Sequence, residues 1–129
     1  MSEDDFKRGW KRMVEINELG AEAFRDRMED FAPDLYRDTV EFVYGNVLSR
    51  PVLDLKTREL ITVAALTALG DTRSQLRFHI YGALNVGCTR EEVLEVIMQM
   101  GVYAGWPAAL NAINVAREIF EARDEEGLD

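Results

Sequence analysis

The chain has 129 residues, of which 47% are hydrophobic and 30% charged, a balance typical of one folded globular domain. Its formal net charge of −9 argues against nucleic acid or an anionic membrane surface as a partner, because both bind clustered positive charge. A single cysteine, Cys88, excludes an intramolecular disulfide, and the absence of an apolar signal segment favours a cytoplasmic, reducing setting. We therefore expect one soluble domain over residues 1–129.

Three helices are predicted in the first fifty residues. An apolar stripe of Phe6, Trp10, Met13 and Val14 indicates an amphipathic helix over Asp4–Ile16, which Gly20 interrupts. A short second helix follows and stops before Pro33, because the residue before proline resists helical angles. Pro33 can open the next helix. Its expected buried residues are Leu35, Thr39, Phe42, Val43 and Val47.

The next predicted helix runs from Leu55 to Leu69, with Asp54 as its N-cap and Gly70 as its terminator. Its sequence is apolar nearly all round. Such a helix is expected to be surrounded by other elements or by neighbouring subunits, so we place it at the centre of the bundle.

His79, the sole histidine, lies in the following helix, which is expected to end at Gly87. Helical spacing turns Arg73 and Arg77 outward. The face expected to pack inward consists of Gln75, Leu76, His79, Ile80, Ala83 and Leu84.

Two further helices complete the prediction. Thr89 and Glu92 form a capping box at the start of one, and Trp106-Pro107 begins the other. Gly101 and Gly105 are expected to admit another backbone closely. No stretch alternates with period two, so the predicted class is all-α, with about six helices. The expected inner faces are Val93, Val96, Ile97, Met100 and Ala104, then Leu110, Ile113, Ala116, Arg117 and Phe120, before a frayed acidic tail over 124–129.

Glu59 and His79 are the candidate acid and base groups. Glu59 shares the inward face of its helix with Val63, so an inward carboxyl and an inward imidazole on consecutive helices could meet. Alternatively, Glu59 favours the positive end of the helix dipole or pairs with Arg58 of a neighbour, and His79 is a structural residue with satisfied hydrogen bonds.

Substrate-binding candidates are Arg58, Gln75, Tyr103 and Trp106, although a single arginine is often just solvated and aromatic residues often belong to the core. Cys88 follows a helix end, where it is either activated or a buried, inert thiol. With one histidine and one cysteine, the chain holds no typical zinc site.

Four blocks resemble the carboxymuconolactone decarboxylase family. They are Leu53–Thr62, Gln75–Gly87, Thr89–Val93 and Val102–Ala109, within a region of resemblance from about Leu53 to Phe120 that follows the N-terminal helices of residues 1–50. The resemblance implies a small AhpD-like helical fold that forms a ring-shaped homohexamer, a trimer of dimers. It also implies decarboxylation of the anionic substrate 4-carboxymuconolactone to 3-oxoadipate enol-lactone, in protocatechuate catabolism, without a cofactor.

Relatives that resemble alkylhydroperoxidase AhpD carry a Cys-x-x-Cys-x-x-x-His motif. Aligned on His79, this chain has Thr72 and Gln75 at the two cysteine positions, so the resemblance disfavours a dithiol peroxidase. His79 then becomes the acid/base or oxyanion-stabilising residue of a decarboxylase, with Glu59 beside it. The alternatives are a non-catalytic oligomeric module that binds a small molecule, and a redox protein that uses Cys88.

Overall fold

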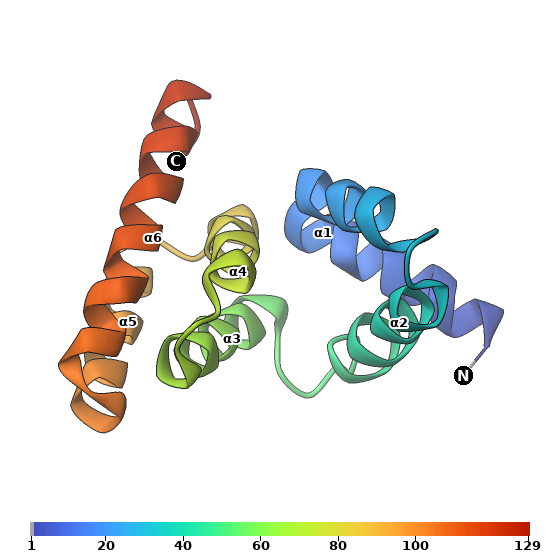
Figure 1. Cartoon of the computed structure of the whole chain (residues 1–129), viewed down its shortest axis with the longest axis horizontal. Helices are drawn as coiled ribbons and strands as arrows, with labels where there is room; N and C mark the ends of the chain where they lie inside the picture. Colours follow the sequence, from blue (N-terminus) through green and yellow to red (C-terminus); the bar gives the residue numbers. More distant parts are fainter. Residues whose placement is uncertain (1) are drawn as a thin grey trace. The chain divides into compact units, whose positions relative to one another are not determined.

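The computed structural model describes residues 2–129, which form helices and connecting turns without a β-strand (Figure 1). The all-α prediction is therefore confirmed. The chain divides into two compact units, one ending at Leu55 and one spanning Lys56–Asp129. The first unit contains α1 (Glu3–Met28), α2 (Pro33–Asp38) and the π-helical segment η1 (Thr39–Val47); α3 (Leu55–Leu69) starts at the boundary, and α4 (Arg73–Asn85), α5 (Arg90–Ala104) and α6 (Trp106–Glu125) complete the second.

The first predicted break falls at Asn17 and not at Gly20. Asn17 has extended backbone angles, φ −158° and ψ 92°, inside α1. Its side-chain Oδ1 accepts a hydrogen bond from the Gly20 backbone N–H at 2.9 Å, as an N-cap does for a new helix. The two predicted helices are therefore two segments of one kinked element. Asparagine ends the first segment because its side chain replaces a backbone hydrogen bond.

The third predicted helix forms, but its buried face is wrong. Leu35 and Phe42, expected in the core, are 56% and 51% exposed. The face that packs is formed by Tyr36, Val40, Glu41, Tyr44 and Gly45. Both faces are largely apolar in the sequence, although the second includes Glu41. The second face packs against α1, because the ring of Tyr36 lies 5.9 Å from that of Phe6 and the backbones of α1 and η1 meet at glycines.

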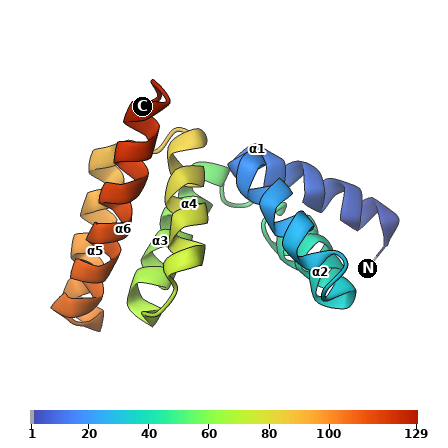
Figure 2. The same cartoon turned by 45° about the horizontal axis from the view of Figure 1, so that its top comes forward.

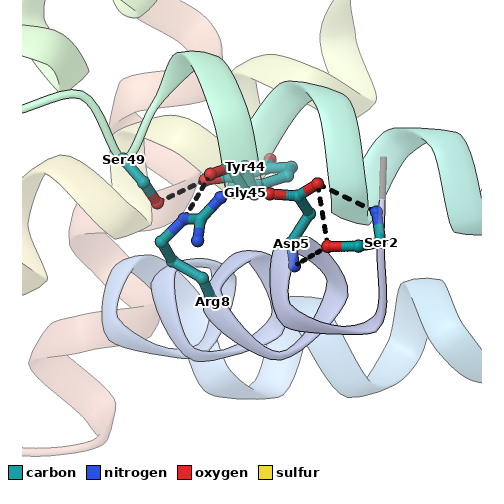
Figure 3. Close-up of polar contacts among 6 residues, drawn as sticks. All are labelled: Ser2, Asp5, Arg8, Tyr44, Gly45 and Ser49. Atoms are coloured by element: carbon teal, nitrogen blue, oxygen red, sulfur yellow. Dashed lines mark hydrogen bonds and ion pairs between the residues drawn. The ribbon is translucent and has the colours of Figure 1, made fainter.

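Gly9 and Gly45 are the points where α1 and η1 touch backbone to backbone. A Cβ added at Gly9 would lie 1.9 Å from the Val40 carbonyl oxygen, and one added at Gly45 would lie 2.2 Å from that of Asp5. Near the end of η1, Arg8 Nε of α1 donates a hydrogen bond to the Gly45 carbonyl oxygen at 2.7 Å (Figure 3). No side chain larger than hydrogen fits at either glycine without separating the two helices.

The second unit arranges its four helices alternately up and down (Figure 2). The bounds of α3 agree with the prediction, and Gly70 follows it with a φ of +71°. Within the chain, however, α3 is not enclosed on all sides: only Glu59, Val63 and Thr67 are buried, whereas Leu69 is 75% exposed. A helix that is apolar nearly all round therefore contributes a single buried stripe to this unit.

The faces by which the last two helices pack against the core match the prediction only in part. Val93 and Ile97 of α5 are buried as expected, but α6 buries Ala109, Ala112 and Val115, while Leu110 is 53% exposed. Small alanines let α6 approach its neighbours more closely than the predicted leucine face would allow. That close approach, which the sequence spacing did not indicate, turns Leu110 outward.

Gly101 within α5 and Gly105 just after it have different roles. A Cβ at Gly101 would lie 2.8 Å from Cε3 of Trp106, so this glycine makes room for the indole ring. Gly105 has a φ of +103°, and a Cβ added there would meet only Pro107 Cδ, at an ordinary contact distance of 3.8 Å, so this glycine serves the turn into α6 and not a close approach.

The predicted frayed tail is wrong, because polar contacts hold it. Arg90 donates to the Asp124 carboxylate at 2.8 Å. Arg123, only 4% exposed, donates to the side-chain oxygen of Asn85 at 2.8 Å and also contacts the backbone oxygen of Asp129. Buried arginines are stable only when paired in this way.

We expect Gly9→Ala to destabilise the protein by about 3 kcal/mol or more, because the new methyl group collides with the Val40 carbonyl. An ordinary helical glycine would show the opposite sign, since alanine gains about 1 kcal/mol there. Urea unfolding followed by circular dichroism measures the difference, and a stabilised variant would contradict the packing described.

The capping box of α5 predicts a pH effect. Glu92 Oε1 accepts a hydrogen bond from the Thr89 backbone N–H at 2.9 Å. This bond is the main cause, and the hydrogen bond from Lys56 the second, of a pKa of the Glu92 carboxyl that lies below its usual value. A lowered folded-state pKa stabilises the protein above the unfolded pKa, and the gain is lost as the pH falls. The stability difference between wild type and Glu92→Gln should therefore be complete at neutral pH, begin to fall near the unfolded-state pKa of about 4.3, and vanish once the pH is below the lowered folded-state pKa. Glu91→Gln, in the same helical turn, is the control for charge alone.

Candidate acid–base site

Glu59 and His79 meet in the second unit. Glu59 lies on the single buried stripe of α3, and His79 lies on the inward face of α4. His79 Nδ1 is 2.8 Å from Glu59 Oε1. The sequence left open whether these two side chains touch, and the structure shows that they form a hydrogen bond.

The pair is largely removed from solvent. Glu59 is 0% exposed and His79 9%. The second carboxyl oxygen of Glu59, Oε2, is buried and has no hydrogen-bond partner among the described residues. A buried carboxyl group with only one of its two oxygens hydrogen-bonded lowers the stability of the fold. A purely structural contact is not expected to retain such a group.

Hydrophobic packing fixes both side chains. Leu76 and Ile80, which flank His79 on the inward face of α4, are 5% and 0% exposed and belong to the same core cluster as Val63 of α3. The ring of Phe78 lies 4.8 Å from the imidazole. Phe78 was not among the sequence candidates, because an aromatic residue beside a histidine carries no distinctive signal.

The hydrogen bond divides the roles of the two ring nitrogens. When Nδ1 carries the proton and donates to the carboxylate, Nε2 of a neutral ring is an acceptor, and in an imidazolium it is a donor. The carboxylate can also balance the positive charge of an imidazolium formed during a reaction. This arrangement is suited to moving one proton at Nε2.

The other candidates occupy different positions. Arg58, beside Glu59 on α3, is half-buried, whereas Gln75, expected to face inward, is exposed one turn before His79. Tyr103 and Trp106 lie at the α5–α6 turn and are 79% and 52% exposed. Gln75 is turned outward because Leu76 and Ile80 occupy the core side of α4.

Arg73 and Arg77 face outward as predicted, and both contact the carboxylate of Glu118 on α6.

Cys88 is 5% exposed, and its thiol donates to the Lys56 carbonyl at 3.5 Å. These features correspond to the buried, inert thiol and not to the activated one. A cavity of about 530 Å³ lies beside Cys88 and the C-terminal residues, and neither His79 nor Glu59 lines it.

The part of the chain that the structure describes contains no helix long and apolar enough to cross a membrane. Within residues 2–129, no three histidine, cysteine or acidic side chains are grouped as metal ligands.

We expect imidazole nitrogen NMR spectra to show the neutral His79 ring protonated at Nδ1, because Glu59 accepts from that atom. Glu59→Ala should abolish this preference. Glu118→Ala, which removes an acidic group contacting the outer face of α4, is the matched control and should leave the His79 signals unchanged. A wild-type ring protonated mainly at Nε2 would contradict the assigned hydrogen bond.

The chain is similar to several known proteins. It is 35% identical over 120 residues to 4-carboxymuconolactone decarboxylase of Acinetobacter baylyi, covering 92% of this chain and 89% of that protein. It is 33% identical over 132 residues to an uncharacterized 15.0 kDa protein of Paracoccus denitrificans, covering 95% and 98%. Nitrosuccinic acid decarboxylase of Metarhizium robertsii is 32% identical over 88 residues, covering 67% of this chain and 60% of that protein.

The match to a family model includes both members of the buried pair. It spans residues 33–118, and so begins at α2, earlier than the resemblance from Leu53 indicated. Together with the 35% identity to 4-carboxymuconolactone decarboxylase over most of the chain, this match shows that the protein belongs to the carboxymuconolactone decarboxylase family.

Proposed function

We propose that this protein is a decarboxylase that converts 4-carboxymuconolactone, or a closely related unsaturated lactone acid, to the corresponding enol-lactone without a cofactor. The buried hydrogen bond between Glu59 and His79 is the observation that carries the proposal. The names of two relatives, 4-carboxymuconolactone decarboxylase and nitrosuccinic acid decarboxylase, support loss of a carboxyl group as the reaction class.

The proposed reaction moves one electron pair and one proton. The bond between the ring carbon and the carboxylate breaks, carbon dioxide leaves, and the electron pair moves through the conjugated system to the carbonyl oxygen of the lactone. An oxyanion develops on that oxygen, and the lactone carbonyl then re-forms as carbon takes a proton, so the ring stays intact. The reaction therefore consumes one proton in each cycle.

His79 is assigned the proton transfer and Glu59 the position of the imidazole. With Nδ1 bonded to the carboxylate, Nε2 is the atom that donates to the oxyanion or to carbon. The His79 side chain retains 11% exposure, so the ring can regain its proton from solvent. Glu59 acts through His79 and is thus a positioning residue.

We also propose that Arg58 binds a substrate carboxylate and that Gln75, Tyr103 and Trp106 contact the substrate. A chain with a net charge of −9 repels an anion, so a local arginine is needed to reverse the field. The half-buried Arg58 precedes Glu59 in α3 and meets this need. The remaining expectations, a ring-shaped hexamer working in the cytoplasm in aromatic catabolism, belong to the same proposal.

The experiment is turnover of 4-carboxymuconolactone by the purified protein, followed by ultraviolet absorbance together with carbon dioxide release. Turnover at ordinary enzyme rates, about 1 per second or faster, supports the proposal. If neither signal changes, 4-carboxymuconolactone is not the substrate. The reaction class is then tested with nitrosuccinic acid, and failure there favours a non-catalytic binding protein.

Replacing the pair should affect kcat more than KM. We expect His79→Ala to lower kcat by about 10²- to 10⁴-fold, the usual contribution of a positioned acid or base. Glu59→Gln should have a smaller effect, because the amide keeps the shape but loses the charge that balances an imidazolium. Arg77→Gln on the same helix is the control, since Arg77 faces outward and pairs with the Glu118 carboxylate. Near-normal turnover by His79→Ala would remove His79 from the mechanism.

A further inference from the structure

The cavity beside Cys88 is lined by neither Glu59 nor His79 and has no role in the proposed reaction. Its volume of about 530 Å³ is that of pockets that hold small organic ligands. One wall belongs to the end of α4 and the start of α5, and the other to the C-terminal strap, which we define as residues 124–129. The residues that matter most are Leu84, Gly87 and Arg90 on the first wall, and Asp124, Leu128 and Asp129 on the second.

The first wall combines one positive charge with an apolar surface. Among the described residues that line it, Arg90 is the only charged one, and Leu84 supplies apolar surface. The Arg90 guanidinium is held in place, because it lies over the Phe120 ring at 5.1 Å from the ring centroid. A fixed guanidinium beside an apolar surface is suited to a carboxylate that carries an apolar body.

The C-terminal strap already places acceptors on Arg90. Arg90 Nη2 donates to the Asp124 carboxylate at 2.8 Å and to the Leu128 carbonyl oxygen at 3.3 Å. The side chains of Arg90 and Asp124 are 32% and 63% exposed, so their ion pair adds little stability. The Tyr81 hydroxyl adds an exposed hydrogen bond to Glu126 at 3.1 Å. A carboxylate from outside can therefore replace that of Asp124 without leaving Arg90 unpaired.

A turn at Gly127 directs the strap toward the cavity. Gly127 has a φ of +74°, and the Leu128 N–H donates to the Arg123 carbonyl at 2.8 Å, as in many helix ends where the chain reverses. If the strap leaves, Arg123 loses its contact there but keeps its hydrogen bond to Asn85 and its place over the Tyr81 ring. Opening therefore leaves no buried charge without a partner.

We propose that this cavity binds a small organic carboxylate, which takes the place of the Asp124 carboxylate on Arg90 and displaces the C-terminal strap. The strap closes the cavity when that ligand is absent. Four of the six strap residues are acidic, so displacement also moves negative charge away from the incoming anion. The proposal goes beyond the decarboxylase reaction and does not depend on it.

The test uses benzoate as the probe and benzamide as its neutral counterpart. Each is titrated into the whole protein at constant ionic strength, and the backbone amide NMR signals of Gly87 on the first wall and Gly127 in the strap are followed. We expect benzoate to shift both signals saturably, and benzamide to leave them unchanged, because only the carboxylate can pair with Arg90. The absence of a saturable shift with benzoate, or an equal response to benzamide, overturns the proposal.

Three charge variants locate the probe. Arg90→Gln should weaken benzoate binding at least about tenfold, because the cation is lost. Asp124→Asn should tighten it about twofold to fivefold, because the competing carboxylate is removed. Glu125→Gln removes the same charge from a neighbouring residue that does not line the cavity, and it should bind benzoate like the wild type. Equal affinities of Asp124→Asn and Glu125→Gln would show that the strap does not compete with the ligand.

A matched pair of glycines tests the strap without altering Arg90. Gly127 and Gly70 each follow a helix with φ of +74° and +71°, and a Cβ added at either would meet nothing within 4 Å. Alanine disfavours this conformation, so Gly127→Ala should loosen the strap and tighten benzoate binding about fivefold or more, whereas Gly70→Ala should not change it. Circular dichroism checks that every variant keeps its helices. Wild-type affinity in a folded Gly127→Ala would contradict closure by the strap.

Discussion

The contact between Glu59 and His79 is the interaction on which the second unit most depends. Only three residues of α3 are buried, and one of them is a carboxyl group without any exposure. Water cannot solvate this group, so the imidazole of α4 has to supply its hydrogen bond. The surrounding core prevents either side chain from turning away. Attachment of α3 and placement of the candidate acid–base group therefore follow from the same hydrogen bond.

Small residues determine how closely the other helices approach. Gly9 and Gly45 allow α1 and η1 to meet at their backbones, and Gly101 allows the Trp106 ring to lie on α5. In both places the absence of a side chain decides which neighbouring side chains become exposed. Trp106 is 52% exposed with its ring against Gly101. The face of α2 and η1 that contains Leu35 is exposed because Gly9 and Gly45 bring the opposite face against α1.

Charge is distributed unevenly over this chain. Most of the sequence carries charged residues at ordinary density, whereas the 21 residues from Val96 to Ala116 carry none. The net charge of −9 repels anions, so the anionic substrate proposed above would depend on a local arginine that reverses the field.

The sequence by itself determined the helical class, the bounds of α3, the capping box at Thr89, and the inward direction of Glu59 and His79. These features depend on local hydrogen bonds and on the 3.6-residue period, which neighbouring residues specify. The family was also recognisable from short blocks. Tertiary structure alone decided the contact between Glu59 and His79, the buried faces of η1 and α6, and the attachment of the C-terminal residues to Arg90 and Arg123. Those features depend on which of two apolar faces meets a partner, and on glycines and alanines whose effect appears only when another helix approaches.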